Sequence, residues 1–217
     1  MKNINTTKKE KILNTSQHLF YENGFNNTSF EEIAVYCNIT KPLISYHFGS
    51  KAKLGGNIFG KYSKEMSDLF FEKVYANFTG TKIIDIVAAF SLMQLKYYRH
   101  DEKAFRFYDE FFNSSFADVT VGIEDFYKMH NRMAGKKYSK EELHMIYIGS
   151  NYAARGLIYH FITGNITCSE EQFELYYLEN SFWKFDIDEI KLEKIHKKAK
   201  EISENISINF LTDFKWN

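Results

Sequence analysis

Proline is almost absent from this sequence, since Pro42 is its single occurrence in 217 residues. Few breaks are therefore imposed on helices, and the alternating apolar and polar residues typical of strands are hard to find. Cysteine is also scarce. Cys37 and Cys168 are too few for a disulfide framework, which makes the cytoplasm the expected location.

Long apolar runs are missing as well. The longest candidate, residues 83–90, is interrupted by Asp85 and is far shorter than the roughly 18 residues that a membrane span needs. The first eight residues have no apolar core and do not resemble a signal peptide. The sequence contains neither a glycine-rich phosphate loop nor a Gly-x-Ser-x-Gly motif. We therefore expect neither an enzyme nor a bound cofactor, and no membrane partner.

Helical patterns fill the chain. Hydrophobic residues make up 44% and charged residues 26%, a composition typical of a folded globular protein. Ser139 with Glu142, and Ser169 with Gln172, have the spacing of a helix capping box. We predict an all-α fold with helices over residues 8–23, 29–37, 41–48, 50–76, 82–98, 102–113, 119–133, 139–163, 169–182 and 187–208.

Charge is divided unevenly along the chain, although the total is zero. Residues 1–64 contain nine lysines, four glutamates and no arginine or aspartate, which gives a net charge of +5. The remaining residues contain 19 basic and 24 acidic side chains, which gives −5. A basic module joined to an acidic body indicates that the N-terminal part binds a polyanion.

The first three predicted helices form a small module with a short turn between the second and the third. Asn38, in that turn, tolerates the left-handed conformation that a tight interhelical connection needs. A helix, a turn of three or four residues and a short helix form the helix-turn-helix pattern, whose second helix enters the DNA major groove. Pro42 suits the first turn of that helix, and the sequence leaves open whether Thr40 or Lys41 caps it.

The two faces of the helix over residues 41–48 differ in chemistry. Ile44 and Phe48, four residues apart, are expected to face the core. On the opposite side, lysines suit phosphates and Leu43 suits a thymine methyl group. Hydroxyl groups at the starts of the second and third helices complete the set. The predicted DNA-binding residues are Thr28, Ser29, Thr40, Lys41, Pro42, Leu43, Ser45, Tyr46, His47 and Lys51.

A series of short motifs occurs in a specific order between residues 8 and 62. The motifs are Ile12-Leu13, Leu19-Phe20, Gly24-Phe25, Thr28-Ser29-Phe30-Glu31-Glu32-Ile33-Ala34, Ile39-Thr40-Lys41, Tyr46-His47-Phe48, Ser50-Lys51 and Leu54. In this order they resemble the DNA-binding domain of TetR-family transcriptional regulators.

The resemblance implies a helix-turn-helix DNA-binding domain over residues 1–49, with the start of a fourth helix reaching about residue 62. Residues 50–217 would form a larger helical domain for ligand binding and dimerisation. The implied protein is a homodimeric repressor that binds a palindromic operator in double-stranded DNA. A small-molecule effector would release it by favouring the conformation that does not bind DNA.

Aromatic residues three or four apart in the body are candidates for the pocket of a lipophilic or aromatic ligand. The sequence does not distinguish such a pocket from ordinary core, or from the aromatic richness that an AT-rich genome produces. The predicted ligand-binding residues are Phe105, Tyr108, Phe112, Phe126, Met129, Tyr152, Tyr159 and His160.

Small residues suggest two further features. Gly149, Ala153 and Gly156 form a strip on the helix over residues 139–163, which we expect to contribute to the dimer surface. Gly55, Gly56 and Gly60, in the helix over residues 50–76, indicate either a compliant joint or close packing against the first helix.

Two other functions use different residues. Glu141 with His144, and Glu193 with His196, are Glu-x-x-His pairs of the kind found in di-iron helical bundles, so a metal-binding enzyme is one alternative. A helical adaptor whose basic end binds an acidic protein is the other.

Overall fold

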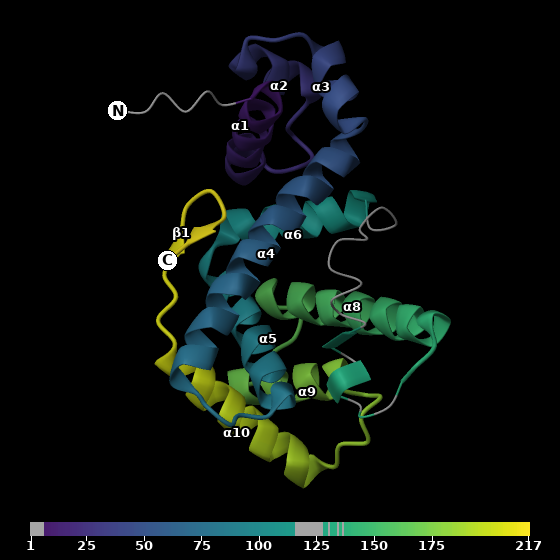
Figure 1. Ribbon diagram of the computed structural model, residues 1–217, viewed down its shortest axis with the longest axis vertical. Coiled ribbons are helices and arrows are strands. Elements are labelled where there is room, and N and C mark those ends of the chain that lie inside the picture. The colour runs from purple at the N-terminus through teal and green to yellow at the C-terminus, as the bar shows by residue number, and fades with distance from the viewer. Residues whose placement is uncertain (1–6, 116–127, 130, 134, 136) are drawn as a thin grey trace. The chain divides into compact units, whose positions relative to one another are not determined.

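A computed structural model describes residues 7–115, 128–129, 131–133, 135 and 137–217, and it confirms the all-α fold (Figure 1). Every described helix was predicted, with ends that differ by three residues or fewer. Most of the predicted helix over residues 119–133 lies outside the described residues. The elements are α1 (Lys8–Asn23), α2 (Phe30–Cys37), α3 (Lys41–Phe48), α4 (Lys51–Asn77), α5 (Ile83–His100), α6 (Glu102–Ser115), α8 (Lys140–Ile162), α9 (Glu170–Ser181), α10 (Glu189–Asn205), β1 (Phe210–Leu211) and β2 (Lys215–Trp216).

Local capping explains where several helices begin. Both predicted capping boxes are present: the Ser139 hydroxyl accepts from the backbone N–H of Glu142, and Ser169 does the same for Gln172. The first helix begins in the same way at Thr7, which the sequence analysis did not predict. It ends at Gly24, whose φ of 88° lies in the region that favours glycine.

The chain divides into two compact units. One comprises the described residues of Met1–Met66, Asp101–Val121 and Asn209–Asn217, and the other those of Ser67–His100 and Gly122–Ile208. The predicted boundary after residue 49 remains a prediction. This division differs from it, because α6 and the C-terminal strands group with α1–α3.

Aromatic side chains form the core of the first unit. The ring of Phe107 lies 5.8 Å from that of Phe20 and 4.9 Å from that of Phe214, measured between centroids. Phe214 also stacks on Tyr62 at 4.8 Å, and all four side chains are buried. Residues from both ends of the chain therefore stabilise the same core.

The predicted last helix, over residues 187–208, is followed by two short strands that were not predicted. That helix ends at Asn205, and β1 and β2 form an antiparallel hairpin with Phe210 opposite Trp216. Asp213 and Phe214, in the loop of this hairpin, have φ values of 58° and 55°. Burial of Phe214 offsets the cost of this left-handed backbone.

The second unit packs α5 against α10 and α8 against α9. Glu174 of α9 and His196 of α10 are both buried, and His196 Nε2 lies 2.7 Å from a carboxylate oxygen of Glu174. Lys200 Nζ lies 3.4 Å from the same oxygen. Charged and polar side chains thus join these two helices in addition to apolar packing.

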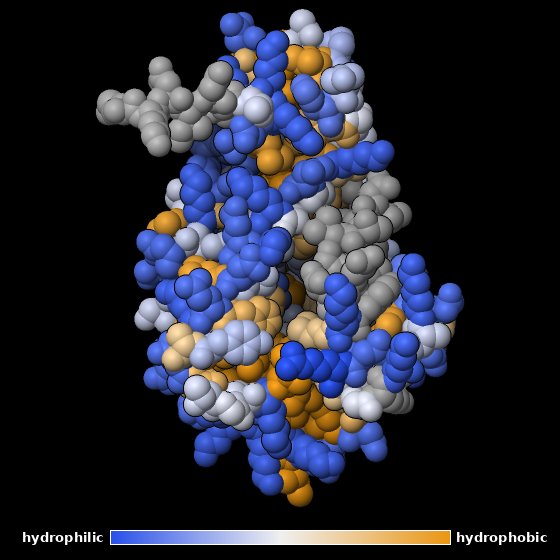
Figure 2. Space-filling view, in the orientation of Figure 1, coloured by the Kyte–Doolittle hydropathy of each residue, from blue (hydrophilic) through white to orange (hydrophobic). Residues whose placement is uncertain are grey.

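The face drawn in Figure 2 is covered mainly by hydrophilic residues, with smaller apolar patches between them. Within the described part of the chain, no helix combines the length and hydrophobicity that crossing a membrane requires.

Candidate nucleic-acid interface and effector cavity

The turn between α2 and α3 has the predicted left-handed residue. Asn38 has φ 50° and ψ 52°, and its backbone N–H donates to the carbonyl oxygen of Val35 at 3.0 Å. The N–H of Ile39 donates to the carbonyl of Ala34 at 3.0 Å. These two bonds end α2 and let the chain enter α3 after only three residues.

The inner and outer faces of α3 are those expected from the sequence. Ile44 is fully buried and Phe48 is 5% exposed, whereas Tyr46 is 83% exposed. Lys41 and Pro42 are exposed at the start of the helix, and Leu43, Ser45 and His47 are partly exposed. The outer face therefore presents a phenol, a hydroxyl and an imidazole beside a lysine, as a recognition helix requires.

The start of α3 is settled by the structure. Thr40 is the N-cap, although its side chain makes no capping hydrogen bond, and its hydroxyl is exposed. Lys41 forms an ion pair with Glu31, and this hydrogen bond lowers the pKa of the Glu31 carboxyl. Both side chains are more than half exposed, so the pair is weak and a DNA phosphate can replace Glu31.

Thr28 corrects one predicted DNA contact. Its side chain is fully buried, and its hydroxyl donates to the carbonyl oxygens of Gly24 at 2.8 Å and Leu19 at 3.2 Å. The hydroxyl therefore closes the end of α1 and is not available to a phosphate. Ser29, its neighbour, is exposed and caps α2 by accepting from the N–H of Glu32 at 3.1 Å.

Lys51 corrects a second predicted contact. Its ammonium group donates to the carbonyl oxygens of Phe25, Thr28 and Asn26 at 2.9, 3.2 and 3.4 Å. Partial burial lowers its pKa. Lys51 therefore holds the loop between α1 and α2, and a phosphate would have to displace three carbonyl oxygens to reach it.

Lys53, two residues further on, was not among the predicted DNA-binding residues. Lys53 is exposed in the first turn of α4, where its backbone N–H donates to the Ser50 hydroxyl at 3.1 Å. Its side chain lies close to Gly49, which ends α3. The sequence Lys51-Ala52-Lys53 offers two lysines that could bind a phosphate, but it does not show which of them is exposed.

A cavity of about 200 Å³ lies within the second unit, among α5, α8 and α9. Apolar groups from α5, α8, Phe182 and two methionines line it together with hydroxyl and amide groups. No charged side chain is found among the described residues that line it. These residues are Val87, Phe90, Ser91, Gln94, Met129, Met133, Ser150, Asn151, Ala154, Tyr177, Ser181 and Phe182.

Among the predicted ligand-binding residues, Met129 lines this cavity and Phe126 lies outside the described residues. The α6 candidates Phe105, Tyr108 and Phe112 belong to the first unit. There Phe112 packs on Phe59 at 4.9 Å and on Tyr108 at 4.8 Å between ring centroids. Tyr108 and Phe112 therefore belong to an aromatic cluster with Phe59, and none of the three α6 candidates is among the described residues that line the cavity.

The α8 candidates are also placed away from the cavity. Tyr152, Tyr159 and His160 are exposed, whereas Ser150, Asn151 and Ala154 of the same helix line it. Tyr159 and His160 lie seven and eight residues after Tyr152, which places all three near one helix face, but the sequence did not indicate which face borders the cavity.

The two Glu-x-x-His pairs do not assemble as a di-iron site needs. Glu141 and His144 are exposed in the first turns of α8, and His196 is engaged by Glu174. Among the described residues, a single group of three potential metal ligands lies within 4.8 Å, formed by His18, Glu22 and Asp213. Neither Glu-x-x-His pair belongs to it.

Comparison with known proteins agrees with this geometry. Residues 12–55 match the family described as "Bacterial regulatory proteins, tetR family". Among curated proteins, none matches this sequence significantly.

Several solved structures are similar to this chain. A putative tetR family transcription regulator from Shewanella sp. PV-4 has 18% sequence identity and a TM-score of 0.51 over 82% of this chain and 96% of its own. A transcriptional regulator of the TerR/AcrR family from Aquifex aeolicus VF5 has 22% identity and a TM-score of 0.39, over 90% and 99% of the two chains. A TetR-like transcriptional regulator from Rhodococcus sp. RHA1 has 14% identity and a TM-score of 0.42, over 94% and 100%.

The structure from Shewanella, with a TM-score above 0.5, shows a shared fold. The family match covers the segment in which Asn38 forms the turn and α3 presents its polar face. Residues 12–55 of this chain therefore form a helix-turn-helix that is similar to that of the tetR family of regulatory proteins.

Proposed function

We propose that the protein is a transcriptional repressor that binds a palindromic operator as a homodimer and is released by a small uncharged ligand. The observation that carries this proposal is the orientation of α3, which buries Ile44 and Phe48 and exposes Tyr46. The match of residues 12–55 to a family of regulatory proteins supports it.

The contacts to DNA divide by chemistry. Lys41 and Lys53 are exposed lysines suited to phosphates, which position the protein without reading sequence. Ser45, Tyr46 and His47 of α3 carry groups that can reach base edges. An eight-residue helix is about 12 Å long, which is close to the width of the major groove.

The exposed side of α8 favours a second copy of the chain as partner. Met145, Ile148, Tyr152 and Tyr159 are 65%, 40%, 49% and 37% exposed, and their spacing places them on one helix face. Gly156 lies near this stripe, and no atom of the described residues stands within 4 Å of the position that a Cβ would occupy there. A closely approaching helix from a second copy would bury the stripe.

The dimer is tested by replacing Ile148 with aspartate and measuring mass by analytical ultracentrifugation. We expect Ile148→Asp to give a monomer, because the charge would be buried in the interface. Val35→Asp is the matched control, since Val35 is 78% exposed on α2 and does not belong to this stripe. A dimer that withstands Ile148→Asp would contradict this interface.

The lining of the α5–α8–α9 cavity favours an uncharged ligand with a lipophilic part. The hydroxyls of Ser91 and Ser181 donate to carbonyl oxygens of their own helices, at 3.0 and 2.8 Å. Their oxygens are therefore left as hydrogen-bond acceptors. A ligand that offers a hydroxyl or amide donor to these oxygens suits the cavity better than an anion.

The effector is tested by screening uncharged small molecules, and charged analogues of each, for release of a labelled operator. We expect release by uncharged compounds only. Ala154→Phe should fill the cavity and abolish release while DNA binding persists, and Tyr159→Phe should have no effect because Tyr159 does not line the cavity. Release that is lost in Tyr159→Phe and kept in Ala154→Phe would place the ligand elsewhere.

Selection of bound sequences from a random DNA pool tests the central proposal. We expect a palindrome whose half-sites lie about one helical turn apart. DNA retention that falls steeply with salt but enriches no sequence would contradict an operator-binding protein. That result would favour the helical adaptor for an acidic partner.

A further inference from the structure

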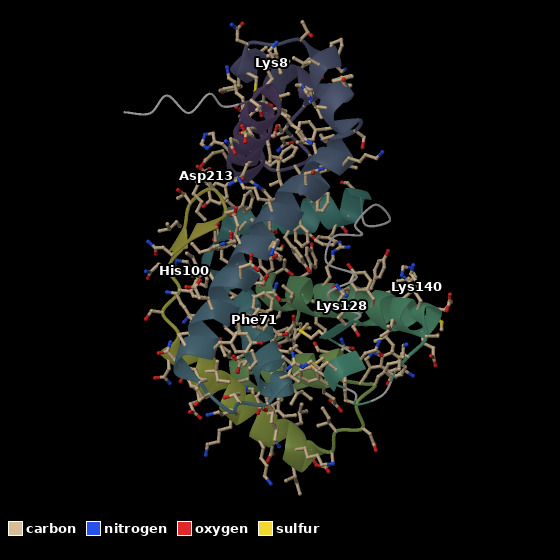
Figure 3. All side chains as sticks on the ribbon, viewed as in Figure 1. Lys8, Phe71, His100, Lys128, Lys140 and Asp213 are labelled. Carbon is tan, nitrogen blue, oxygen red and sulfur yellow. The ribbon has the colours of Figure 1, made fainter. Side chains whose placement is uncertain are left out.

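Three potential metal ligands meet in the first unit, away from the α3 surface. His18 and Glu22 are four residues apart on α1, one turn from each other. Asp213 reaches them from the C-terminal hairpin, whose position beside α1 is seen in Figure 3. One ligand atom from each of the three lies within 4.8 Å of the other two.

The imidazole and the aspartate are already in contact. His18 Nδ1 lies 2.8 Å from Oδ1 of Asp213, although the two residues are 195 positions apart in the chain. The His18 side chain is 57% exposed and that of Asp213 25% exposed, so an ion can enter from solvent.

A buried polar side chain holds Asp213 in place. Gln17, which is 6% exposed, donates from Nε2 to the backbone carbonyl of Asp213 at 2.6 Å and accepts from Lys61 at 3.3 Å. On the other side, Phe214 is fully buried in the aromatic core. The carboxylate therefore projects from a backbone fixed at two points, which is how supporting contacts preorganise metal ligands.

We infer that His18, Glu22 and Asp213 form a binding site for a borderline divalent cation such as Zn²⁺. One imidazole nitrogen and two carboxylates are ligands that zinc accepts, whereas magnesium and calcium take oxygen ligands. Ligand atoms about 2 Å from a tetrahedral zinc lie roughly 3.3 Å apart, so small side-chain rotations complete the site. Water supplies the remaining position.

Two lysines compete with the cation. Lys103 forms an ion pair with Glu22, and Nζ of Lys215 lies 4.0 Å from Asp213. The cation has to replace the Lys103 ammonium at Glu22, and so Lys103→Met should tighten binding rather than weaken it. Tighter binding in Lys103→Met would distinguish a cation site from a cluster in which the carboxylates only form ion pairs with lysines.

The bound ion would fasten the C-terminal hairpin to the first helix of the DNA-binding module. An ion that binds the folded chain and not the unfolded chain raises the unfolding temperature. This inference is independent of the proposed function, because neither the α3 face nor the α5–α8–α9 cavity contributes a ligand.

The experiment uses the untagged full chain and Co²⁺ or Zn²⁺ alone. Co²⁺ absorption reports the coordination, and calorimetry gives the stoichiometry and affinity of Zn²⁺. We expect one ion per chain, a higher unfolding temperature with Zn²⁺ but not with Mg²⁺, and tightening in Lys103→Met. His18→Gln and Asp213→Asn should each weaken Zn²⁺ binding by about tenfold or more.

Controls keep the result interpretable. Asn tolerates the left-handed backbone of residue 213, and His18 is on the surface, so both variants should fold, which circular dichroism checks. His144→Ala removes an exposed histidine of α8 and should leave Zn²⁺ affinity unchanged. Absence of Zn²⁺ binding at millimolar concentration, or binding equally strong in His18→Gln and Asp213→Asn, would overturn the inference.

Discussion

The ammonium nitrogen of Lys51 lies 2.9 Å from the carbonyl oxygen of Phe25 and 4.6 Å from the centroid of the Phe25 ring. The lysine thus satisfies a backbone acceptor and makes a cation–π contact with the same residue. Its charge serves the loop between α1 and α2, whereas Lys53 offers its charge to solvent.

Lys51→Met should therefore reduce stability, whereas Lys53→Met should reduce DNA binding. Loss of the hydrogen bonds at Lys51 should lower the free energy of unfolding by about 1–3 kcal/mol, measured by urea denaturation. Lys53→Met should leave stability unchanged but reduce the slope of log K against log[salt] for operator binding by about 0.9. A Lys51→Met protein that is as stable as the parent would contradict the structural role of Lys51.

Tyr46→Ala should weaken operator binding by about tenfold or more without changing the unfolding temperature, because this side chain is 83% exposed. Ile44→Asp should instead unfold the module, since an unpaired charge would replace a fully buried side chain. Circular dichroism and a fluorescence-anisotropy titration separate the two effects. A Tyr46→Ala protein with unchanged affinity for its operator would remove this residue from the interface.

Gly55 and Gly56 differ in the space around them. A Cβ at Gly55 would stand 2.8 Å from the ring of Phe25 and 2.9 Å from that of Phe111, whereas at Gly56 the nearest atom is 3.8 Å away. Gly55→Ala should cost about 1–3 kcal/mol of stability through overpacking. Gly56→Ala should stabilise by up to roughly 1 kcal/mol through helix propensity. Equal effects in urea denaturation would indicate that packing does not explain Gly55.

The buried contact between Glu174 and His196 gives a fourth prediction. His196→Ala should lower the free energy of unfolding by about 3–5 kcal/mol. Among the described residues it leaves Lys200 as the remaining charged partner of the buried Glu174 carboxylate. Replacing both residues by leucine should restore most of this loss. Urea denaturation of the single and double variants measures the coupling. A double variant as unstable as His196→Ala would mean that apolar packing cannot substitute for the pair.

Features set by short-range physics were predictable from the sequence. Asn38 adopts the left-handed conformation, Gly24 ends the first helix, and Ser139 and Ser169 cap the helices assigned to them. Each depends on residues within four positions, so a single sequence contains all of the information.

Features set by distant contacts were not predictable in the same way. Thr28 and Lys51 have the right chemistry for phosphates, but carbonyl oxygens of the α1–α2 region bind them instead. Nothing in the sequence indicates that Asp213 reaches α1, because 195 residues separate it from His18. The residues of α8 that line the cavity were missed for a related reason. Helical spacing shows which residues share a face, but it does not show which other helix that face packs against.

The placement of Phe214 has a consequence for how the protein is made. Its ring completes a core shared with Phe20, Tyr62 and Phe107, so the N-terminal unit needs a residue that is synthesised long after α3. Translation at about 5–20 residues per second adds a delay of several seconds or more between synthesis of α3 and arrival of this ring. Newly made chains should therefore reach their full affinity for DNA only after Phe214 has been synthesised.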